Sequence, residues 1–296
     1  MMVGVRRVFY GARVWVVAGT AVLCMMPVLF IMLNSFMSPL EAGARYTSLV
    51  TPYSSFGVIN SDNMHYMDMG LLPDVLTVSG WRQILLEDPT HLRYLWNSII
   101  LSVPVVLGNL VIAPLAAYGF ERMRAKRGEK LFAAYVITMI LPMQALLVPH
   151  FIAASFFGIN GNYLAIILPA VFAPFGVFLI RQHLKGFEKE IIEAASVDGA
   201  GEFQIFRKMV LPNIKPTMIA LTVLTFAEVW NIVDQAVVFI HREREMPMSV
   251  HLSTVFSGDG IGFAFAISSL FMIPALIVFI YGQDYIADGV GYSGIR

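Results

Sequence analysis

The chain is poor in two features that soluble proteins use freely, cysteine and charge. Cys24 is the single cysteine in 296 residues, which excludes a disulfide framework within the chain and a cysteine-based metal site. Charged residues make up only 14% of the sequence, and the formal net charge is zero. Without a basic field there is nothing to attract nucleic acid. We therefore expect no nucleic-acid partner, no metal ion and no redox chemistry.

The sequence also lacks the signature of a nucleotide-hydrolysing protein. No G-x-x-x-x-G-K-[ST] loop, whose backbone amides would hold the phosphates of ATP, occurs anywhere in it. We expect no catalytic residues and no cofactor. If the protein uses ATP, another subunit must hydrolyse it.

Apolar residues, in contrast, are abundant. They make up 57% of the chain, whereas an ordinary soluble domain has about 45–50%. A membrane-spanning helix needs about 20 predominantly apolar residues. The first such stretch is longer than the apolar core of a signal peptide, so we expect it to remain as an anchor. An all-α membrane protein with six transmembrane helices is predicted, at residues 14–36, 98–120, 131–153, 162–182, 217–240 and 263–283.

Lys and Arg are distributed unevenly among the segments that join these spans. They concentrate in three segments: the N-terminus, the segment between the second and third spans, and the segment between the fourth and fifth. Loops rich in Lys and Arg face the cytoplasm, so both termini are predicted to be cytoplasmic. The residues concerned are Arg6, Arg7, Arg13, Arg122, Arg124, Lys126, Arg127, Lys130, Arg181, Lys185, Lys189, Arg207, Lys208 and Lys215, against Arg45, Arg82, Arg93, Arg242 and Arg244 on the other side.

This topology divides the chain into a short series of segments. The long outer loop is acidic and contains a Met- and Tyr-rich part at 64–69, which fits either a solvated connector or a docking surface for an external partner. Both interpretations remain open. The segments are a cytoplasmic N-terminus at 1–13, the first span at 14–36, the outer loop at 37–97, the core at 98–283 with a cytoplasmic loop at 183–216, and a cytoplasmic tail at 284–296.

The fifth span is the most polar. At 100° per residue, four polar side chains would share one face of a continuous helix: Thr225, Glu228, Asn231 and Gln235. Polar groups at membrane depth face protein or a water-filled cavity. The face is therefore predicted either to line a translocation path or to form hydrogen bonds between helices. Isolated polar residues occur in other spans, namely Asn109, Thr138, Gln144 and His150, and for His150 a packing role is the more common one.

The loop between the fourth and fifth spans has the pattern of two short helices with a break between them. Strong helix formers dominate 187–197, and Gly199 and Gly201 interrupt them. A second apolar stripe follows and ends at Pro212. Exposed apolar stripes are disfavoured unless something covers them. Either a partner protein or the chain's own helices must cover this stripe, which consists of Phe203, Phe206, Met209 and Val210, and a partner is the sharper of the two interpretations.

The same loop carries a specific motif. The order Glu-Ala-Ala, three residues, Gly, nine residues, an apolar residue, any residue and Leu-Pro resembles the cytoplasmic signature of ABC importer permeases. It is formed here by Glu193, Ala194, Ala195, Gly199, Met209, Leu211 and Pro212. Other parts resemble the maltose-type carbohydrate branch of that family, including Asn97-Ser98, Leu115–Phe120, Leu168-Pro169, Pro174-Phe175, Asp198–Ala200 and Trp230-Asn231.

The resemblance implies a type I importer permease in the cell membrane of a prokaryote. The chain would pair with a second permease subunit and carry a sugar or oligosaccharide delivered by an extracytoplasmic solute-binding protein. A dimer of cytoplasmic ATP-binding subunits would supply energy. Coupling to that ATPase would use a polar contact from Glu193, close approach at the alanines and a turn at Gly199, within the set Glu193, Ala194, Ala195, Asp198, Gly199, Leu211 and Pro212.

Three alternatives remain open at this point. An ion-driven secondary transporter could use Glu228 and Asp234 as a proton or sodium site. A non-catalytic membrane scaffold or receptor subunit would need no ATPase at all. An ABC permease could also carry a solute other than a sugar, such as a polyamine or phosphate, because the motif identifies the coupling device and not the solute.

Overall fold

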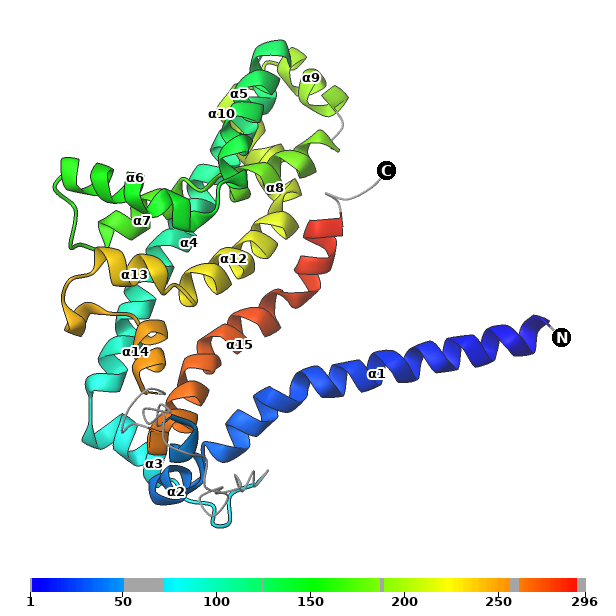
Figure 1. Cartoon of the computed structure of the whole chain (residues 1–296). Helices are drawn as coiled ribbons and strands as arrows, with labels where there is room; N and C mark the ends of the chain where they lie inside the picture. Colours follow the sequence, from blue (N-terminus) through cyan, green and yellow to red (C-terminus); the bar gives the residue numbers. More distant parts are fainter. Residues whose placement is uncertain (1, 51–71, 124, 187–188, 256–260, 292–296) are drawn as a thin grey trace. The chain divides into compact units, whose positions relative to one another are not determined.

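A computed structural model describes residues 2–50, 72–123, 125–186, 189–255 and 261–291. Within these ranges the chain is helical and contains no β-strand, which confirms the predicted all-α class (Figure 1). The helices are α1 (Met2–Asn34), α2 (Pro39–Val50), α3 (Ser79–Arg82), η2 (Gln83–Glu87), α4 (Thr90–Arg122), α5 (Ala125–Ile137), η3 (Thr138–Ile140), α6 (Met143–Phe156), α7 (Leu164–Val171), α8 (Pro174–Lys185), α9 (Lys189–Val197), α10 (Glu202–Ile205), η4 (Phe206–Val210), α11 (Leu211–Asn213), α12 (Lys215–Trp230), α13 (Asp234–Phe239), η5 (Glu243–Glu245), α14 (Met248–Val255) and α15 (Ile261–Gly291).

The chain divides into two compact units. Unit 1 comprises residues 1–92 and 252–272, and unit 2 comprises 93–251 and 273–296. The polypeptide passes from one unit to the other within α4, α14 and α15.

Unit 1 contains α1 and the described part of the predicted outer loop up to residue 92. Its small core is formed by Met37, Ala42 and Tyr46, with Phe265 of α15 packed edge-on against Tyr46 at a ring-centroid distance of 5.1 Å. Arg45 pairs with Glu41 and Asp74 at 3.2 and 2.6 Å. Residues 51–71 lie outside the described ranges, and with them the Met- and Tyr-rich part at 64–69.

The apolar side chains of α1 remain exposed. Over the span at Arg13–Asn34, no part of the most apolar stretch is buried within the chain, and Trp15 and Val22 are 78% and 70% exposed. Large apolar side chains that their own chain leaves uncovered are stable only in contact with lipid or with another protein.

The number of long apolar helices agrees with six spans when bent helices are counted as single spans. Four qualify directly, at Arg13–Asn34, Thr90–Arg122, Leu164–Lys185 and Gly262–Ile286. Two further pairs qualify only together: Lys126–Ile140 with Met143–Phe156, bent by 106°, and Glu202–Asn213 with Lys215–Trp230, bent by 70°. The predicted third span at 131–153 is therefore not one straight helix.

Prolines explain two of the breaks. A residue that precedes proline is driven into extended backbone conformations because its amide and Cβ collide with the proline ring. Leu141, before Pro142, has ψ 126°, and α5 with η3 ends there. Ala173, before Pro174, has ψ 134° and separates α7 from α8 within the predicted fourth span.

The fifth predicted span is interrupted without a proline. Helix α12 ends at Trp230 and α13 begins at Asp234. The Asn231 side chain donates a hydrogen bond to the carbonyl of Ala227 at 2.8 Å, the acceptor that the backbone N–H of residue 231 would use in a regular helix. The prediction of one continuous helical face over 217–240 is therefore wrong.

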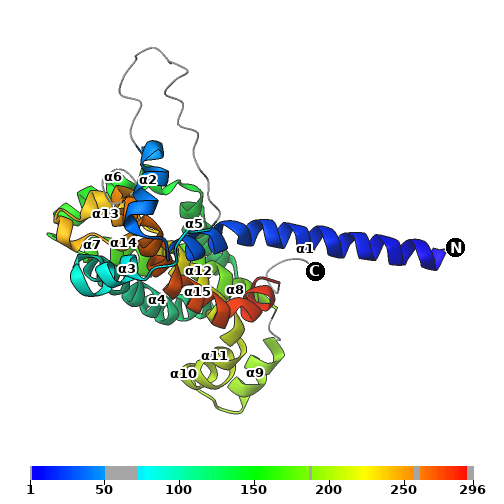
Figure 2. The same ribbon diagram turned by 90° about the horizontal axis from the view of Figure 1, so that it is seen from below.

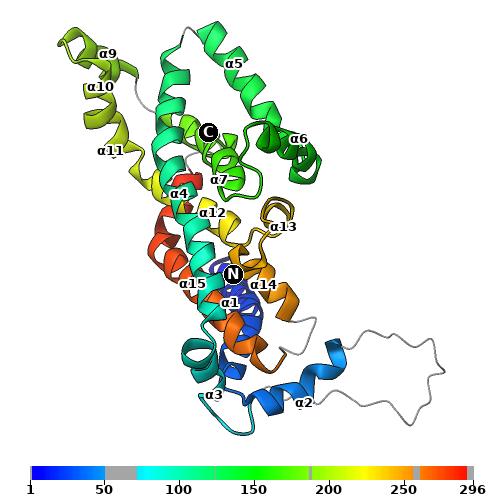
Figure 3. The same cartoon turned by 90° about the vertical axis from the view of Figure 1, so that its left-hand side faces the viewer.

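The larger core of unit 2 lies around the C-terminal half of α4. Buried side chains from α4, α5, α8, α9, α10 and α12 meet there, among them Ala117, Phe132, Ile180 and Leu221. Figures 1 and 3 show α9 and α10 at the same end of this unit as the junction of α4 and α5. The loop predicted at 183–216 thus packs against the helices of its own chain.

Candidate functional site

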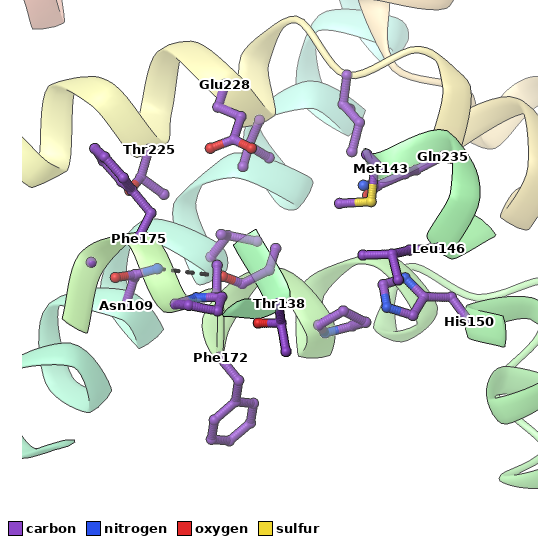
Figure 4. Close-up of a pocket in the computed structure, with 18 of the residues that line it drawn as sticks. Asn109, Thr138, Met143, Leu146, His150, Phe172, Phe175, Thr225, Glu228 and Gln235 are labelled. Atoms are coloured by element: carbon purple, nitrogen blue, oxygen red, sulfur yellow. Dashed lines mark hydrogen bonds between the residues drawn. The ribbon is translucent and has the colours of Figure 1, made fainter. Parts of the chain in front are cut away.

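Two features of unit 2 are candidates for function: a cavity among the broken helices, and a lobe formed by α9, α10, η4 and α11. The cavity has a volume of about 460 Å³. It lies where the breaks at 141–142, 172–173 and 231–233 meet α4 and α12. Figure 4 shows side chains from these elements converging on it, and its polar lining residues are Asn109, Tyr135, Thr138, His150, Thr225, Glu228 and Gln235.

Asn109 of α4 is fixed at one wall. Its Nδ2 donates to the carbonyl of Ala170 at 3.3 Å, while the buried Oδ1 has no hydrogen-bond partner in the described structure. Gly176 of α8 lies so close that a Cβ there would stand 2.3 Å from that oxygen. The absence of a side chain at residue 176 lets α8 approach α4 at this point, as small residues do between membrane helices.

Tyr135 is fixed in a similar way. Its hydroxyl donates to the carbonyl of Phe172 at 2.8 Å, a backbone group that the break between α7 and α8 leaves outside helical hydrogen bonding. Broken helices within a membrane are stable only when such groups find partners inside the protein or in a water-lined cavity. The side chains of α4 and α5 supply those partners.

The opposite wall is formed by α12 and α13. The carboxylate of Glu228 points from α12 toward the cavity (Figure 4), and among the described residues it has no hydrogen bond or ion pair. Phe172 and Phe175 contribute apolar surface to the same space. Mostly apolar walls with a few placed polar groups are typical of small-molecule sites.

The structure separates the four polar residues predicted for this wall. Thr225, Glu228 and Gln235 line the cavity, but Asn231 does not, because the helix ends at Trp230 and the amide of Asn231 turns back to Ala227. Gln235 reaches the cavity from α13, so its position does not follow from the helical periodicity of α12. A role in translocation remains a prediction for all four.

The cavity also includes polar residues of other helices. The sequence shows three of them as isolated polar positions within predicted spans: Asn109, Thr138 and His150. A packing role is the more common one for such a histidine, but His150 lines the cavity. Tyr135 was missed, although it stands one helical turn before Thr138. Asp234 does not reach the cavity wall and instead accepts a hydrogen bond from Gln144 at 3.1 Å.

The lobe begins with α9, which has two faces. Ala195 is only 6% exposed, and with Ile192 it packs into the core around α4 and α8. Glu193 and Ala194 are exposed, and Val197 is 87% exposed. One face therefore attaches the helix to its own chain, and the other is available to another protein. Figure 2 shows α9, α10 and α11 grouped as one lobe. Residues 187–188, part of the predicted helix, lie outside the described ranges.

The end of α9 is sharply defined. Gly199 has φ +82°, in the left-handed region that side chains other than glycine seldom adopt. The amide of Ala200 donates to the carbonyl of Ala195 at 3.0 Å, and that of Gly199 donates to Ser196 at 3.2 Å. These two bonds form a Schellman motif. The helix consequently stops at a fixed residue, and the chain turns toward α10.

The second apolar stripe is mostly covered by the chain itself. Val210 is fully buried, and Phe206 and Met209 pack against the core of α4, α8 and α12. Only Phe203, 73% exposed, stays open. The expectation that a partner covers this stripe is therefore wrong for three of its four members, because the lobe lies on its own bundle.

The helix that carries this stripe does not end at Pro212, where a proline stop is expected, but one residue later at Asn213. The Leu211 amide donates to Phe206, five residues back, and the helical path continues to Asn213. Such a π-helical turn holds one extra residue. This π-helical turn directly precedes Pro212. Because proline has no backbone N–H, residue 212 needs no hydrogen-bond acceptor in the preceding turn.

Comparison with known proteins agrees with this arrangement. Residues 94–292 match the family described as binding-protein-dependent transport system inner membrane component. The chain is 27% identical over 226 residues to the arabinooligosaccharides transport system permease protein AraQ of Halalkalibacterium halodurans, which covers 76% of this chain and 81% of that protein. It is 30% identical over 233 residues to the osmoprotective compounds uptake permease protein GgtD of Synechocystis sp., covering 77% of this chain and 75% of that protein.

A solved structure has a similar fold. One chain of a bacterial ABC transporter involved in the import of the acidic polysaccharide alginate superposes with a TM-score of 0.73 and 24% identity, and the match covers 94% of this chain and 96% of that one. The family match extends over well more than half of the sequence. The chain therefore belongs to the family of binding-protein-dependent transport system inner membrane components, the permease subunits of ABC importers.

Proposed function

We propose that the protein is one of two permease subunits of an ATP-driven importer for a sugar or oligosaccharide. A dimer of separate cytoplasmic subunits hydrolyses the ATP, since the chain has no phosphate-binding loop. An extracytoplasmic protein delivers the solute, and both termini of this chain face the cytoplasm, in keeping with the distribution of Lys and Arg.

The choice of a saccharide rests on the relatives and on the cavity. The names of two of the similar proteins include an oligosaccharide and a polysaccharide. Sugars present hydroxyl groups around an apolar ring face, and the cavity offers amide, hydroxyl and carboxylate groups beside aromatic rings. Thr225, Glu228 and Gln235 are the residues of α12 and α13 that we assign to the path.

The observation that carries the coupling assignment is the two-faced helix α9. Its inner face is anchored in the core through Ala195 and its outer face presents Glu193, Ala194 and Val197. A force applied to the outer face by an ATPase subunit must therefore move the bundle as well. Asp198 belongs to the same contact surface for the ATPase. Gly199 fixes the end of α9, where the chain turns away from that surface. Leu211 and Pro212 belong to the segment that connects the lobe to α12.

The assignment can be tested by reversing the charge on the outer face. In the assembled complex, Glu193→Lys should reduce both uptake and binding-protein-stimulated ATP hydrolysis by about tenfold or more, within the range of ordinary coupling energies. A matched control is Glu243→Lys, which makes the same change on an exposed glutamate of η5. If both activities persist in the Glu193 variant, the coupling assignment is wrong.

A further inference from the structure

The C-terminal end of α4 makes ionic contacts with two different parts of unit 2. The first is with the lobe. The carboxylate of Glu202, the first residue of α10, accepts a hydrogen bond from the hydroxyl of Tyr118 at 2.5 Å and from Nε of Arg122 at 3.1 and 3.0 Å, and also pairs with Nη2 of Arg122. Tyr118 and Arg122 are four residues apart and share one face of α4.

This contact is directional as well as ionic. A guanidinium that approaches a carboxylate through two nitrogens fixes its orientation, and the hydroxyl of Tyr118 adds a third donor. One turn further along the lobe, the ring of Phe206 lies against that of Tyr118 at a centroid distance of 5.4 Å. The lobe is therefore held to α4 by a polar and an apolar contact that must move together.

The second contact begins at the next residue of α4. Glu121 lies 3.5 Å from Nε of Arg181 on α8. The Nη2 of Arg181 donates to Glu129 of α5 at 2.8 Å, and its guanidinium carbon stands 4.0 Å from the ring centroid of Phe132. The Arg181 side chain is only 3% exposed. This arginine therefore ties α4, α5 and α8 together from inside.

Two consecutive residues of α4 thus face in different directions. Arg122 holds the lobe, whereas Glu121 contacts the arginine that joins α8 and α5. Those two helices carry Phe175 and Tyr135 into the cavity wall. A displacement of α10 can therefore reach the cavity through these ionic contacts and through the helices α4, α5 and α8 that they join.

We propose that Arg122 and Glu202 are positioning residues for transport: their ion pair transmits movement of the lobe to α4, and through Arg181 to the helices that line the cavity. The inference rests on the proposed function, because it needs an ATPase that moves α9. The pair is partly exposed, with side chains 38% and 58% accessible, and exposed ion pairs contribute little to folding stability. Its loss should therefore impair coupling more than folding.

The single cysteine of the chain allows a direct measurement. In a Cys24→Ser background, Thr138→Cys places a thiol on the exposed cavity-lining residue of η3. The complete complex, with its ATPase and second permease free of reactive cysteines, is treated with a maleimide with and without AMP-PNP and Mg²⁺. In the parent complex the nucleotide should change the labelling rate of this thiol at least about fivefold, as is typical of allosteric coupling.

The ion pair is then reversed in steps. Arg122→Glu and Glu202→Arg should each reduce the nucleotide response to less than about twofold, and the double reversal should restore a large part of it, which is the pattern of a direct pairwise interaction. Restoration is partial because an arginine at position 202 cannot accept the hydrogen bond of Tyr118. The control Arg82→Glu breaks an ion pair with Glu87 of 3.1 Å in unit 1 and should leave the response unchanged. If a charge reversal prevents assembly, Glu202→Gln and Arg122→Gln test the same contact without placing like charges together.

Two outcomes separate this inference from the function on which it rests. If the parent complex responds to nucleotide and the single variants respond equally well, or the double reversal fails to restore the response, the ion pair transmits nothing and the importer assignment stands. If the parent complex itself shows no response, the coupling of this subunit to an ATPase is overturned.

Discussion

At Gly199 the backbone, rather than packing, determines which residue is allowed. A Cβ there would meet no atom within 4 Å, but φ is +82°, and a left-handed conformation costs other residues about 1–2 kcal/mol. Gly201, two residues later, also has open space around it but an ordinary φ of −72°. The backbone conformation therefore favours glycine at 199, whereas neither the backbone nor the surrounding space requires it at 201.

This difference gives a residue-level prediction. Gly199→Val should destabilise the end of α9 and reduce uptake by the complex several-fold, whereas Gly199→Asn should retain most of the activity because asparagine tolerates the left-handed region. Gly201→Ala is the control and should behave like the unmodified chain. Uptake in proteoliposomes, alongside the yield of assembled complex, measures both effects; equal activity of the valine and alanine variants would contradict the backbone argument.

At the scale of elements, the bends in the helices shape the cavity. Pro142 holds Leu141 in an extended conformation, and the helices on either side diverge by 106°. At 1.5 Å per residue, the ends of Lys126–Ile140 and Met143–Phe156 lie roughly 26 Å apart, against roughly 43 Å for a straight path. The bend therefore turns α6, with Met143 and His150, toward α7 and α13, against which it packs.

Removing the proline should relax this bend. Pro142→Leu is expected to lengthen the distance between spin labels introduced by Lys126→Cys and Phe156→Cys in the Cys24→Ser background by several ångströms, with reduced uptake. Pro27→Leu, within the uninterrupted helix α1, should leave that distance as it was. An unchanged distance in the Pro142 variant would mean that tertiary contacts alone maintain the bend.

Much of this organisation could be predicted from the sequence, and the failures have physical causes. The apolar stretches and the motif at Glu193 are local patterns, so the helical class and the family followed from them. A hydropathy profile is averaged over about 19 residues, so it cannot resolve a helix break that is only two or three residues long. The restriction on Leu141 and Ala173 was readable from the prolines that follow them, whereas nothing comparable marked Asn231.

The covering of the second apolar stripe lay beyond any local pattern. Val210 is buried, and Phe206 and Met209 are partly buried, because residues distant in the sequence on α4 and α8 belong to the same core. A helical periodicity identifies an apolar face, but not whether the chain or a partner occupies it. The sequence therefore predicts an apolar surface open to a partner, whereas Val197 and Phe203 are the only large apolar side chains that are strongly exposed among the described residues of the lobe.

At the scale of the whole molecule, the question is the source of energy. The importer proposed above takes its energy from a separate ATPase, whereas the alternative of an ion-driven carrier would need Glu228 and Asp234 to act together. They lie on separate helices, and Asp234 accepts a hydrogen bond from Gln144.

Uptake by the reconstituted complex should therefore follow the ATP supply. Removing ATP from the side of the ATPase should reduce uptake by about tenfold or more, while ionophores that abolish proton and sodium gradients should leave it nearly unchanged. The opposite result would favour the ion-driven alternative and would place the lobe at α9 outside the mechanism.

The two contacts at the end of α4 differ in their exposure to solvent, and so they must differ in their response to salt. The pair of Arg122 and Glu202 is open to water and ions, and its attraction is screened as the Debye length falls from about 8 Å at physiological ionic strength to about 3 Å at 1 M. The contact between Arg181 and Glu121, whose side chains are 3% and 17% exposed, is less open to ions and keeps more of its attraction. Concentrated salt should therefore weaken the ionic link between α10 and α4 while apolar packing keeps the lobe on the bundle. The ionic composition of the surrounding solution then becomes a means of separating ATP consumption from movement of the cavity.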